Sequence, residues 1–133
     1  MVFWVALRVS LETTTNGFHS PHSFCCQPGR PESRREVEFL VDSGCFYTMV
    51  PRTILEEIGV DPVMEQTFTL ANGDEIRRQV GLVYLFYKDR PGGSLVIFAE
   101  EGDQTLLGVL GLESMGYKLD PVKGDLEPIK LLV

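Results

Sequence analysis

The sequence predicts an all-β domain with one or two short helices. Runs of β-branched and aromatic residues recur along the chain, and Gly, Pro and Asn-Gly turns separate them. Only two segments have the start and stop signals of helices. A length of 133 residues is that of a single domain. No apolar run approaches the roughly 20 residues that a membrane-spanning helix needs, so we expect no membrane partner.

The first predicted strand lies at the start of the chain, in residues 1–11. From Val5 onward, apolar residues alternate with polar ones through Leu7, Val9 and Leu11. Such alternation is typical of a strand with one buried face. The run lacks the basic start of a signal peptide, and Arg8 interrupts it. We therefore interpret it as part of the fold.

Residues 12–35 are predicted to be a flexible loop or an insertion. The segment has no hydrophobic period and contains three prolines, Pro21, Pro28 and Pro31. A structureless stretch of this length is unusual inside a compact domain. The main domain is expected to occupy residues 36–133.

The cysteines and histidines of this loop raise the alternative of a zinc site. His19, His22, Cys25 and Cys26 lie within eight residues, but adjacent cysteines suit tetrahedral ligation poorly, and no second ligand pair follows. We favour an ordinary loop, with no metal. Three cysteines in all do not make a disulfide framework, which indicates a reducing, cytoplasmic compartment.

The main domain is predicted to open with a strand, an extended run and a helix. Val37–Val41 is apolar and β-prone, and Cys45–Val50 has the same character. A helix is expected at Arg52–Ile58, because Pro51 stands at its start and Gly59 just past its end.

Two hairpins are predicted in the middle of the chain. Thr67–Leu70 and Glu75–Tyr87 flank Asn72-Gly73, and Asn-Gly between β-prone runs is a strong hairpin signal. A further turn is expected at Arg90–Ser94, followed by a strand at Leu95–Phe98.

The last third of the domain is predicted to hold a second helix between short strands. Val109–Met115 has helical character and is followed by Gly116. The other expected elements are strands at Thr105–Leu107, Tyr117–Asp120 and Ile129–Val133, with a turn at Pro121–Asp125.

The charge balance argues against a nucleic-acid partner. The net charge is −7, and residues 37–133 alone carry −8. A surface of that sign repels phosphate backbones. Five acidic residues outside the motif discussed next are interpreted as a solvated face: Asp74, Glu75, Glu100, Glu101 and Asp103.

One short motif carries chemistry. Asp42 follows the apolar run Phe39-Leu40-Val41, and a carboxylate at the end of a buried strand is costly unless it is hydrogen-bonded or functional. Ser43 adds a hydroxyl that donates and accepts, and Gly44 allows a tight turn. Alone, Asp-Ser-Gly is a weak signal.

The context of this motif resembles the retropepsin-like aspartic protease family, in particular its prokaryotic branch. Hydrophobic residues precede Asp42-Ser43-Gly44, and Thr48-Met49-Val50-Pro51 follows. Leu106-Leu107-Gly108 is similar to the family's hydrophobic-hydrophobic-Gly motif, and Asn72-Gly73 lies where the family has its flap. The resemblance covers about residues 36–128. It implies the acid protease fold, a closed β-barrel protomer.

The resemblance also implies an activity. The family consists of aspartic endopeptidases, in which two aspartates share a proton and activate a water molecule without a cofactor. Asp-Ser-Gly occurs once in this chain, so Asp42 of a second copy would complete the dyad. The expected partners are thus a homodimer mate and a protein or peptide substrate.

The family assigns supporting roles to further residues. Ser43 and Gly44 would support the active-site loops, and Leu106, Leu107 and Gly108 would lie beside them. The flap over the substrate would consist of Leu70, Ala71, Asn72 and Gly73.

Two residues depart from the family pattern. Cys45 stands where alanine is usual, and Phe46 replaces a smaller or polar residue. A small buried hydrophobic role fits Cys45 better than a reactive thiol. Phe46 keeps open the alternative of a non-catalytic dimeric module that binds peptides without cutting them.

Overall fold

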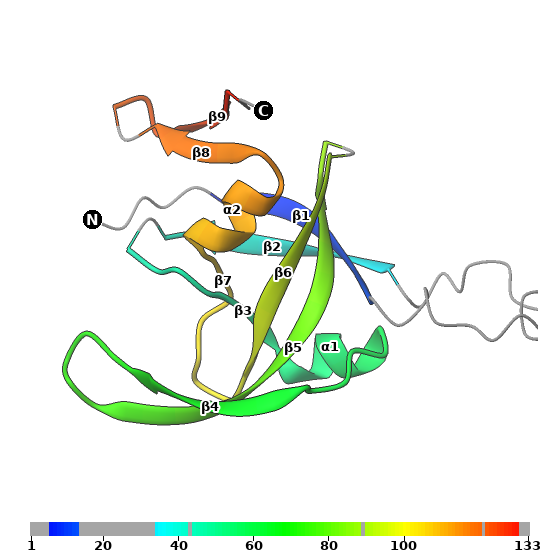
Figure 1. Ribbon diagram of the computed structural model, residues 1–133, viewed down its shortest axis with the longest axis vertical. Coiled ribbons are helices and arrows are strands. Elements are labelled where there is room, and N and C mark those ends of the chain that lie inside the picture. Colours follow the sequence, from blue (N-terminus) through cyan, green and yellow to red (C-terminus); the bar gives the residue numbers. More distant parts are fainter. Residues whose placement is uncertain (1–5, 14–33, 43, 89, 121, 131–133) are drawn as a thin grey trace, which may run out of the picture.

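The computed structural model describes residues 6–13, 34–42, 44–88, 90–120 and 122–130 (Figure 1). Residues 1–5 of the first predicted strand, the four candidate zinc ligands and Ser43 lie outside these ranges. The elements are β1 (Ala6–Thr13), β2 (Arg34–Val41), β3 (Thr48–Pro51), α1 (Arg52–Glu57), β4 (Met64–Thr69), β5 (Glu75–Tyr87), β6 (Arg90–Ala99), β7 (Leu106–Leu107), α2 (Val109–Ser114), β8 (Tyr117–Asp120) and β9 (Asp125–Pro128).

Seven strands form one sheet in the order β1-β2-β7-β3-β6-β5-β4, and β1 also pairs with β5. The pairings therefore run in a circuit from β1 back to β1, with β4 attached outside it. Most neighbours are antiparallel, but β2 and β7 are parallel, as are β3 and β6. The all-β prediction with two short helices is confirmed.

The long strand β5 changes partners halfway along one edge. Glu75–Val80 pairs with β4, whereas Val83–Phe86 pairs with β1. The first half therefore leaves the circuit and forms a projecting hairpin with β4, which we call the β4–β5 hairpin (residues 64–80). In Figure 1 this hairpin lies at the opposite end of the molecule from α2, β8 and β9.

The core lies inside the circuit of strands. Alternate residues of β1 and β2 point inward, as their sequence pattern predicts: Val9 and Leu11 are fully buried, as are Phe39 and Val41. They pack with side chains from the other strands and both helices, among them Val50, Leu55, Leu85, Phe98, Leu107 and Leu112.

Helix α1 ends where the sequence indicates. Ile58 is the C-cap, and Gly59 follows with φ of 84°. The amides of Gly59 and Val60 donate to the carbonyls of Glu56 and Leu55, which is the Schellman pattern of helix ends.

The turn predicted at Arg90–Ser94 is wrong. These residues belong to β6, and Arg90 pairs with Tyr87, so the β5–β6 turn comes earlier. Pro91 is tolerated because β3 pairs with β6 only from Val96 onward. A side chain at Gly92 would come within 2.5–2.8 Å of Ser114 and Met115, so the close approach of the end of α2 requires glycine there.

Other boundaries also differ from the sequence-based expectation. β1 extends to Thr13 and β2 begins at Arg34, so the predicted loop is shorter at both ends. Cys45 and Phe46 are not in a strand, because their carbonyls accept hydrogen bonds from the first amides of α2.

The chain end differs as well. Of the strand predicted at Ile129–Val133, Ile129 and Lys130 are not in a strand, and residues 131–133 lie outside the described ranges. Ile129 instead donates a hydrogen bond from its amide to the carbonyl of Gly116, over 2.7 Å. The hairpin of β8 and β9, with a turn after Asp120 as predicted, forms a separate two-stranded sheet.

None of the helices in the described ranges has the length and apolar character needed to cross a lipid bilayer.

Candidate active site

Asp42 lies directly after β2, at the point where β2 stops pairing with β7. Burial alternates along β2, with Val37, Phe39 and Val41 inside, so Asp42 falls on the side opposite the core. Its side chain is partly exposed. The amide of Gly44 donates to Asp42 Oδ1 over 2.8 Å, and the amide of Cys45 donates to the Asp42 carbonyl over 3.2 Å. This tight turn fixes the carboxylate toward solvent.

Two chain segments, residues 42–48 and 105–110, hold each other in place around Asp42. The amide of Asp42 donates to the carbonyl of Leu107, over 3.2 Å. In the other direction, Val109 and Leu110 donate to the carbonyls of Cys45 and Phe46, over 2.8 and 3.1 Å. The first amides of a helix lack intrahelical partners, and here the loop after Asp42 supplies them.

Gly108 makes this interlocking possible. A Cβ at this position would lie 2.5 Å from the carbonyl oxygens of both Phe46 and Tyr47. Its amide donates to the hydroxyl oxygen of Thr48, over 3.2 Å in a buried position. Leu106-Leu107-Gly108 therefore lies against the segment of Asp42 and residues 44–48.

Cys45 does not have the properties of a reactive nucleophile. Burial raises the pKa of its thiol, a backbone hydrogen bond at Tyr47 lowers it, and the nearby Asp42 carboxylate adds to the rise. The thiol itself donates to the Tyr47 carbonyl over 3.1 Å. The group is therefore a protonated thiol at neutral pH. Phe46, by contrast, is 65% exposed and does not fill the interior of this chain.

The tip of the β4–β5 hairpin is a compact turn. The amide of Leu70 donates to the Asp74 carbonyl over 2.7 Å, and the Asn72 side chain accepts from the Asp74 amide over 2.9 Å. Gly73 has φ of 89°. Among the described residues, no hydrogen bond or ring contact joins this tip to Asp42. The hairpin meets the loop after Asp42 through an edge-to-face contact of Phe68 and Tyr47, with ring centres 5.3 Å apart.

A row of apolar side chains crosses the sheet on the same side as Asp42. Its members are cross-strand partners in register, so they share one face. Val80 and Ile97 are almost fully buried, although they lie outside the core cluster, and the other members are partly exposed. We call these residues the apolar row: Met64, Val80, Ile97, Met49, Leu106 and Leu40.

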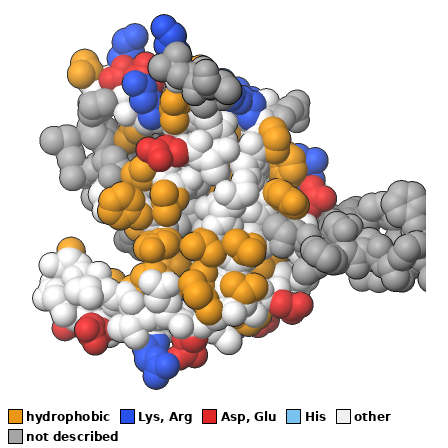
Figure 2. Space-filling model, viewed as in Figure 1, with side chains coloured by type: hydrophobic (Ala, Val, Ile, Leu, Met, Phe, Trp, Pro, Cys, Tyr) orange, Lys and Arg blue, Asp and Glu red, His pale blue; other side chains and the backbone are white. Residues whose placement is uncertain are grey.

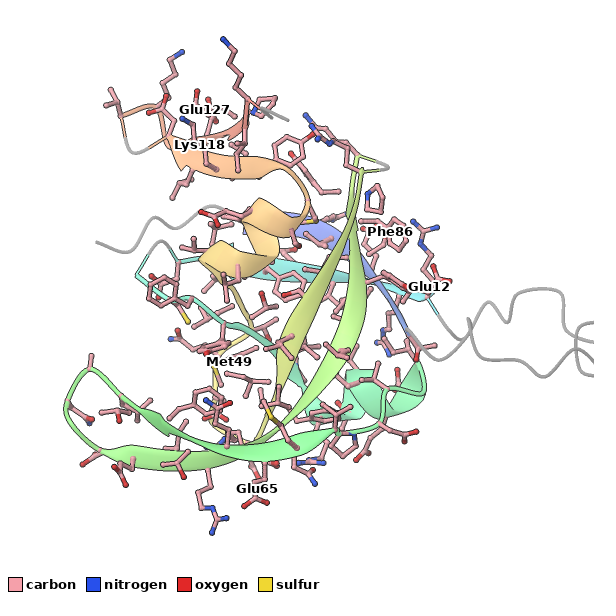
Figure 3. All side chains as sticks on the ribbon, viewed as in Figure 1. Glu12, Met49, Glu65, Phe86, Lys118 and Glu127 are labelled. Atoms are coloured by element: carbon pink, nitrogen blue, oxygen red, sulfur yellow. The ribbon has the colours of Figure 1, made fainter. Side chains whose placement is uncertain are left out.

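Met49 of the apolar row lies beside a recess. Figure 2 shows a hollow between the β4–β5 hairpin and the rest of the molecule, with hydrophobic side chains along its margin. In Figure 3, Met49 lies between β3 and the hairpin, whereas Glu65 lies on the outer face of the hairpin and points away from Met49. An extended chain in this recess would have an apolar surface on one side and the hairpin on the other.

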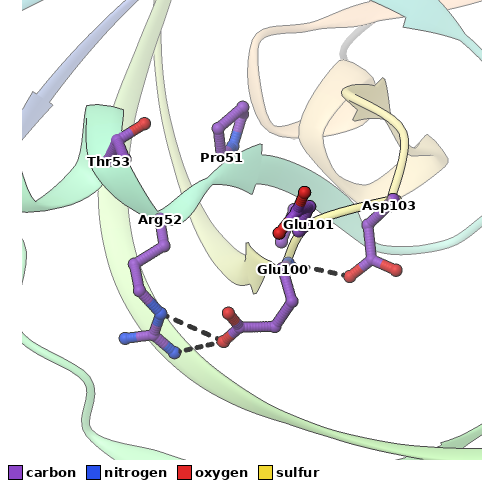
Figure 4. Close-up of a pocket in the computed structure, with 8 residues that line it drawn as sticks. Pro51, Arg52, Thr53, Glu100, Glu101 and Asp103 are labelled. Atoms are coloured by element: carbon purple, nitrogen blue, oxygen red, sulfur yellow. Dashed lines mark hydrogen bonds and ion pairs between the residues drawn. The ribbon is translucent and has the colours of Figure 1, made fainter.

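A pocket of about 350 Å³ lies at one end of β3 and β6 (Figure 4). Pro51 and Ala99, which pair across these strands, form its apolar part. Of the five residues expected to form a solvated acidic face, Glu100 and Asp103 have cationic partners, whereas Asp74, Glu75 and Glu101 are exposed. Glu100 accepts hydrogen bonds from the Arg52 guanidinium at 2.6 and 3.0 Å, and Asp103 is paired with Arg78. The remaining lining residues are Thr53, Glu101 and Gly102.

The described residues offer no metal centre. No group of three or more His, Cys, Asp or Glu side chains is placed to hold an ion within the described ranges. The sequence interpretation named Thr48 as part of a motif but gave it no role, whereas its buried hydroxyl joins the two segments around Asp42. A threonine inside an apolar run was the available signal for it.

The comparisons with known proteins support the fold. The chain matches the solution structure of the protease of simian foamy virus (mac), with 16% identity over 82% of this chain and 92% of that chain, and a TM-score of 0.50. No protein-family model matches the sequence, and no curated protein does either. The chain thus has the fold of a retroviral protease.

Proposed function

We propose that this protein is an aspartic endopeptidase that acts as a homodimer. The observation that carries the proposal is the position of Asp42. It follows a buried strand, is held in a tight turn, and is braced by the Leu106-Leu107-Gly108 segment in a fold of the retroviral protease type. The carboxylate is oriented by a hydrogen bond from the Gly44 amide and is partly exposed to solvent. A group that takes a proton from a water molecule must be accessible in this way.

The second carboxylate would come from a second copy of the chain. A dyad with two-fold symmetry places the same residue of each subunit beside the axis. Phe46 and Leu110 are 65% and 43% exposed, and they lie on the two segments that flank Asp42. Burial of these side chains against a partner would stabilise a dimer there. A two-stranded sheet is marginal on its own, so the β8–β9 hairpin is a further candidate for pairing across the dimer.

The chemistry follows from two carboxylates in close proximity. Two like charges that close cannot both ionise, so the pair holds one proton. The ionised Asp42 takes a proton from a water molecule, which attacks the scissile carbonyl carbon. The protonated Asp42 gives its proton to the carbonyl oxygen. Collapse of the tetrahedral intermediate, with proton transfer to the leaving nitrogen, breaks the peptide bond. A pair of this kind gives a bell-shaped pH profile with two macroscopic pKa values.

The substrate would be an extended peptide in the recess. The apolar row would contact its hydrophobic side chains, and the β4–β5 hairpin, with Leu70, Ala71, Asn72 and Gly73 at its tip, would close over it as a flap. Ser43 of each subunit would connect the two active-site loops by hydrogen bonds, as the family resemblance implies.

The test is cleavage of a diverse peptide mixture between pH 3.5 and 7, with products identified by mass spectrometry. Asp42→Asn should reduce cleavage by about 10²- to 10⁴-fold or more, because a general acid–base group is lost. Asp61→Asn removes an exposed carboxylate after α1 and should leave cleavage unchanged. Equal cleavage by wild type and Asp42→Asn would refute the proposal.

Subunit mixing tests the shared site separately. Excess Asp42→Asn protein, given time to exchange subunits, should suppress wild-type activity. Each mixed dimer then has only one Asp42 carboxylate, and the proposed dyad needs two. A site contained in one chain would be unaffected. Peptide binding by a dimer that cuts nothing over the whole pH range would favour the non-catalytic binding module.

A further inference from the structure

Arg78 lies on the face of β5 that is turned toward the recess. It shares this face with Ile76 and Val80, two residues away on either side along the strand, and Val80 belongs to the apolar row. Gln66 is its cross-strand partner on β4. Its guanidinium is therefore at the base of the β4–β5 hairpin, on the side that would face a substrate, although its side chain is only 18% exposed.

Asp103 belongs to the loop that connects β6 to β7, residues 100–105, which we call the wall loop. The Asp103 carboxylate accepts from the Glu100 amide over 2.8 Å, and the Asp103 amide donates to the Glu100 carbonyl over 3.0 Å. At its far end, the wall loop accepts a hydrogen bond at the Thr105 carbonyl from Leu40, two residues before Asp42. The loop is thus linked to the active-site strand.

The two side chains form a bidentate ion pair. Arg78 Nε donates to Asp103 Oδ2 over 2.7 Å, and Arg78 Nη2 donates to Asp103 Oδ1 over 3.1 Å. A parallel two-bond pair of this kind has defined geometry and more strength than a single contact. Its side chains are the least exposed of the ion pairs among the described residues, at 18% and 17%. It joins the hairpin to the wall loop across one end of the recess.

We propose that Arg78 and Asp103 are a positioning pair that holds the β4–β5 hairpin at a fixed height above the recess. In strand pairing, the hairpin is attached to the circuit only through β5, because β4 has no other partner strand among the described residues. The ion pair adds an attachment on the substrate-facing side, beyond the ring contact of Phe68 with Tyr47. Without the pair, the hairpin would move more freely and form a weaker upper wall for a bound peptide.

The pair should remain intact in mild acid. The Arg78 guanidinium lowers the pKa of Asp103, with a smaller contribution from the Glu100 amide, while partial burial opposes this. The other charged groups here are Glu100 and Glu101 on the same loop and Arg52, which binds Glu100. Because the pKa of Asp103 is lowered, its carboxylate stays ionised and paired with Arg78 as the pH falls through the usual aspartate range. The attachment is lost only when the pH falls through the lowered pKa.

Hydrogen exchange measured by mass spectrometry tests this proposal without any need for activity. In Asp103→Asn and Arg78→Gln, amides of residues 64–80 should exchange about tenfold faster or more than in wild type, as expected for a local opening that has lost its attachment. Amides of β2 should not change. The double variant Arg78→Asp/Asp103→Arg should restore slow exchange.

The matched control is the neighbouring pair on the other face of the hairpin. Arg77 and Glu65 are in contact at 2.8 Å, but their side chains are 74% and 49% exposed. Arg77→Gln and Glu65→Gln should change hairpin exchange by less than about twofold, because exposed pairs contribute little. The same exchange in Asp103→Asn as in wild type, or an equal effect in the control variants, would overturn the proposal.

Kinetics give a second readout, which rests on the proposed function. Asp103→Asn should raise KM for a cleaved peptide at every pH and leave kcat within about twofold, because Asp42 is untouched. Wild type should show the same rise in KM only at a pH below the usual aspartate range, because the pKa of Asp103 is lowered. If no peptide is cut but exchange behaves as expected, the positioning pair stands and only the peptidase proposal fails. A fall in kcat with unchanged KM would contradict the positioning role.

Discussion

The backbone amide of Gly108 donates a hydrogen bond to Thr48 Oγ1 across 3.2 Å, between residues 60 positions apart in the chain. Both residues belong to the segments that hold Asp42 in place. The bond is buried, and the Thr48 side chain is only 1% exposed. The position of the candidate catalytic group therefore depends on contacts that the exposed part of the site does not reveal.

Replacement of Thr48 by valine should destabilise the protein. The substitution keeps the shape of the side chain but leaves the buried Gly108 amide without an acceptor, which costs about 1–3 kcal/mol. Urea denaturation should show this loss in the free energy of unfolding. Thr53→Val, at an exposed position of α1, is the control and should change the free energy by less than about 0.5 kcal/mol. Unchanged stability of Thr48→Val would mean that the amide finds another partner.

Alanine at Gly108 should be more damaging than alanine at Gly93. A Cβ at Gly108 meets two backbone carbonyl oxygens at 2.5 Å, whereas a Cβ at Gly93 meets nothing within 4 Å. Overpacking of this kind costs about 1–3 kcal/mol or more, because a backbone cannot rotate away. Thermal unfolding of the two variants makes the comparison. A similar melting temperature for both would argue against the tight approach of the two segments.

Leu106 and Leu107 should respond differently to truncation, because they face opposite sides of the sheet. Leu107 is fully buried in the core, so Leu107→Ala should lower the free energy of unfolding by about 2–5 kcal/mol. Leu106 is partly exposed in the apolar row. Leu106→Ala should cost less than half as much and instead raise KM for peptides. Denaturation and steady-state kinetics distinguish these effects. A larger loss of stability in Leu106→Ala than in Leu107→Ala would show that the apolar row has been assigned to the wrong face of the sheet.

Cys45 should react slowly with alkylating reagents. Because its pKa is raised, the thiolate fraction at a given pH is lower than in an ordinary thiol, and the thiolate is the reactive form. The alkylation rate should keep increasing beyond about pH 8.5, where an unperturbed thiol levels off. Site-resolved mass spectrometry follows Cys45 apart from the other cysteines, with urea-unfolded protein as the reference. A rate at pH 7 equal to that reference would contradict the protected thiol.

Local signals in the sequence were sufficient for much of the fold. The helix end at Gly59 and the hairpin at Asn72-Gly73 depend on residues next to each other in the chain, and both predictions are confirmed. The family resemblance suggested that Leu106-Leu107-Gly108 lies beside the Asp42 loop, and in the structure the amide of Asp42 donates to the Leu107 carbonyl.

The errors have tertiary causes. Pro91-Gly92-Gly93 has the composition of a turn, but Gly92 lies in a strand because the end of α2 packs against it. Cys45 has strand character, yet its carbonyl accepts a hydrogen bond from α2. The Arg78–Asp103 pair was not predictable, since nothing in either segment indicates which of the acidic residues approaches Arg78.

The circuit of strands also has a consequence for the order of folding. The β4–β5 and β5–β6 pairings join neighbouring stretches of chain, whereas β1 meets β5 only through residues about seventy positions apart, such as Thr13 and Val83. Pairings between distant residues form slowly, because a long loop must close first. The contact of β7 with β2 beside Asp42 is of the same distant kind. A refolding chain should therefore form its hairpins well before it orders the Asp42 loop, and the proposed dimer would assemble last.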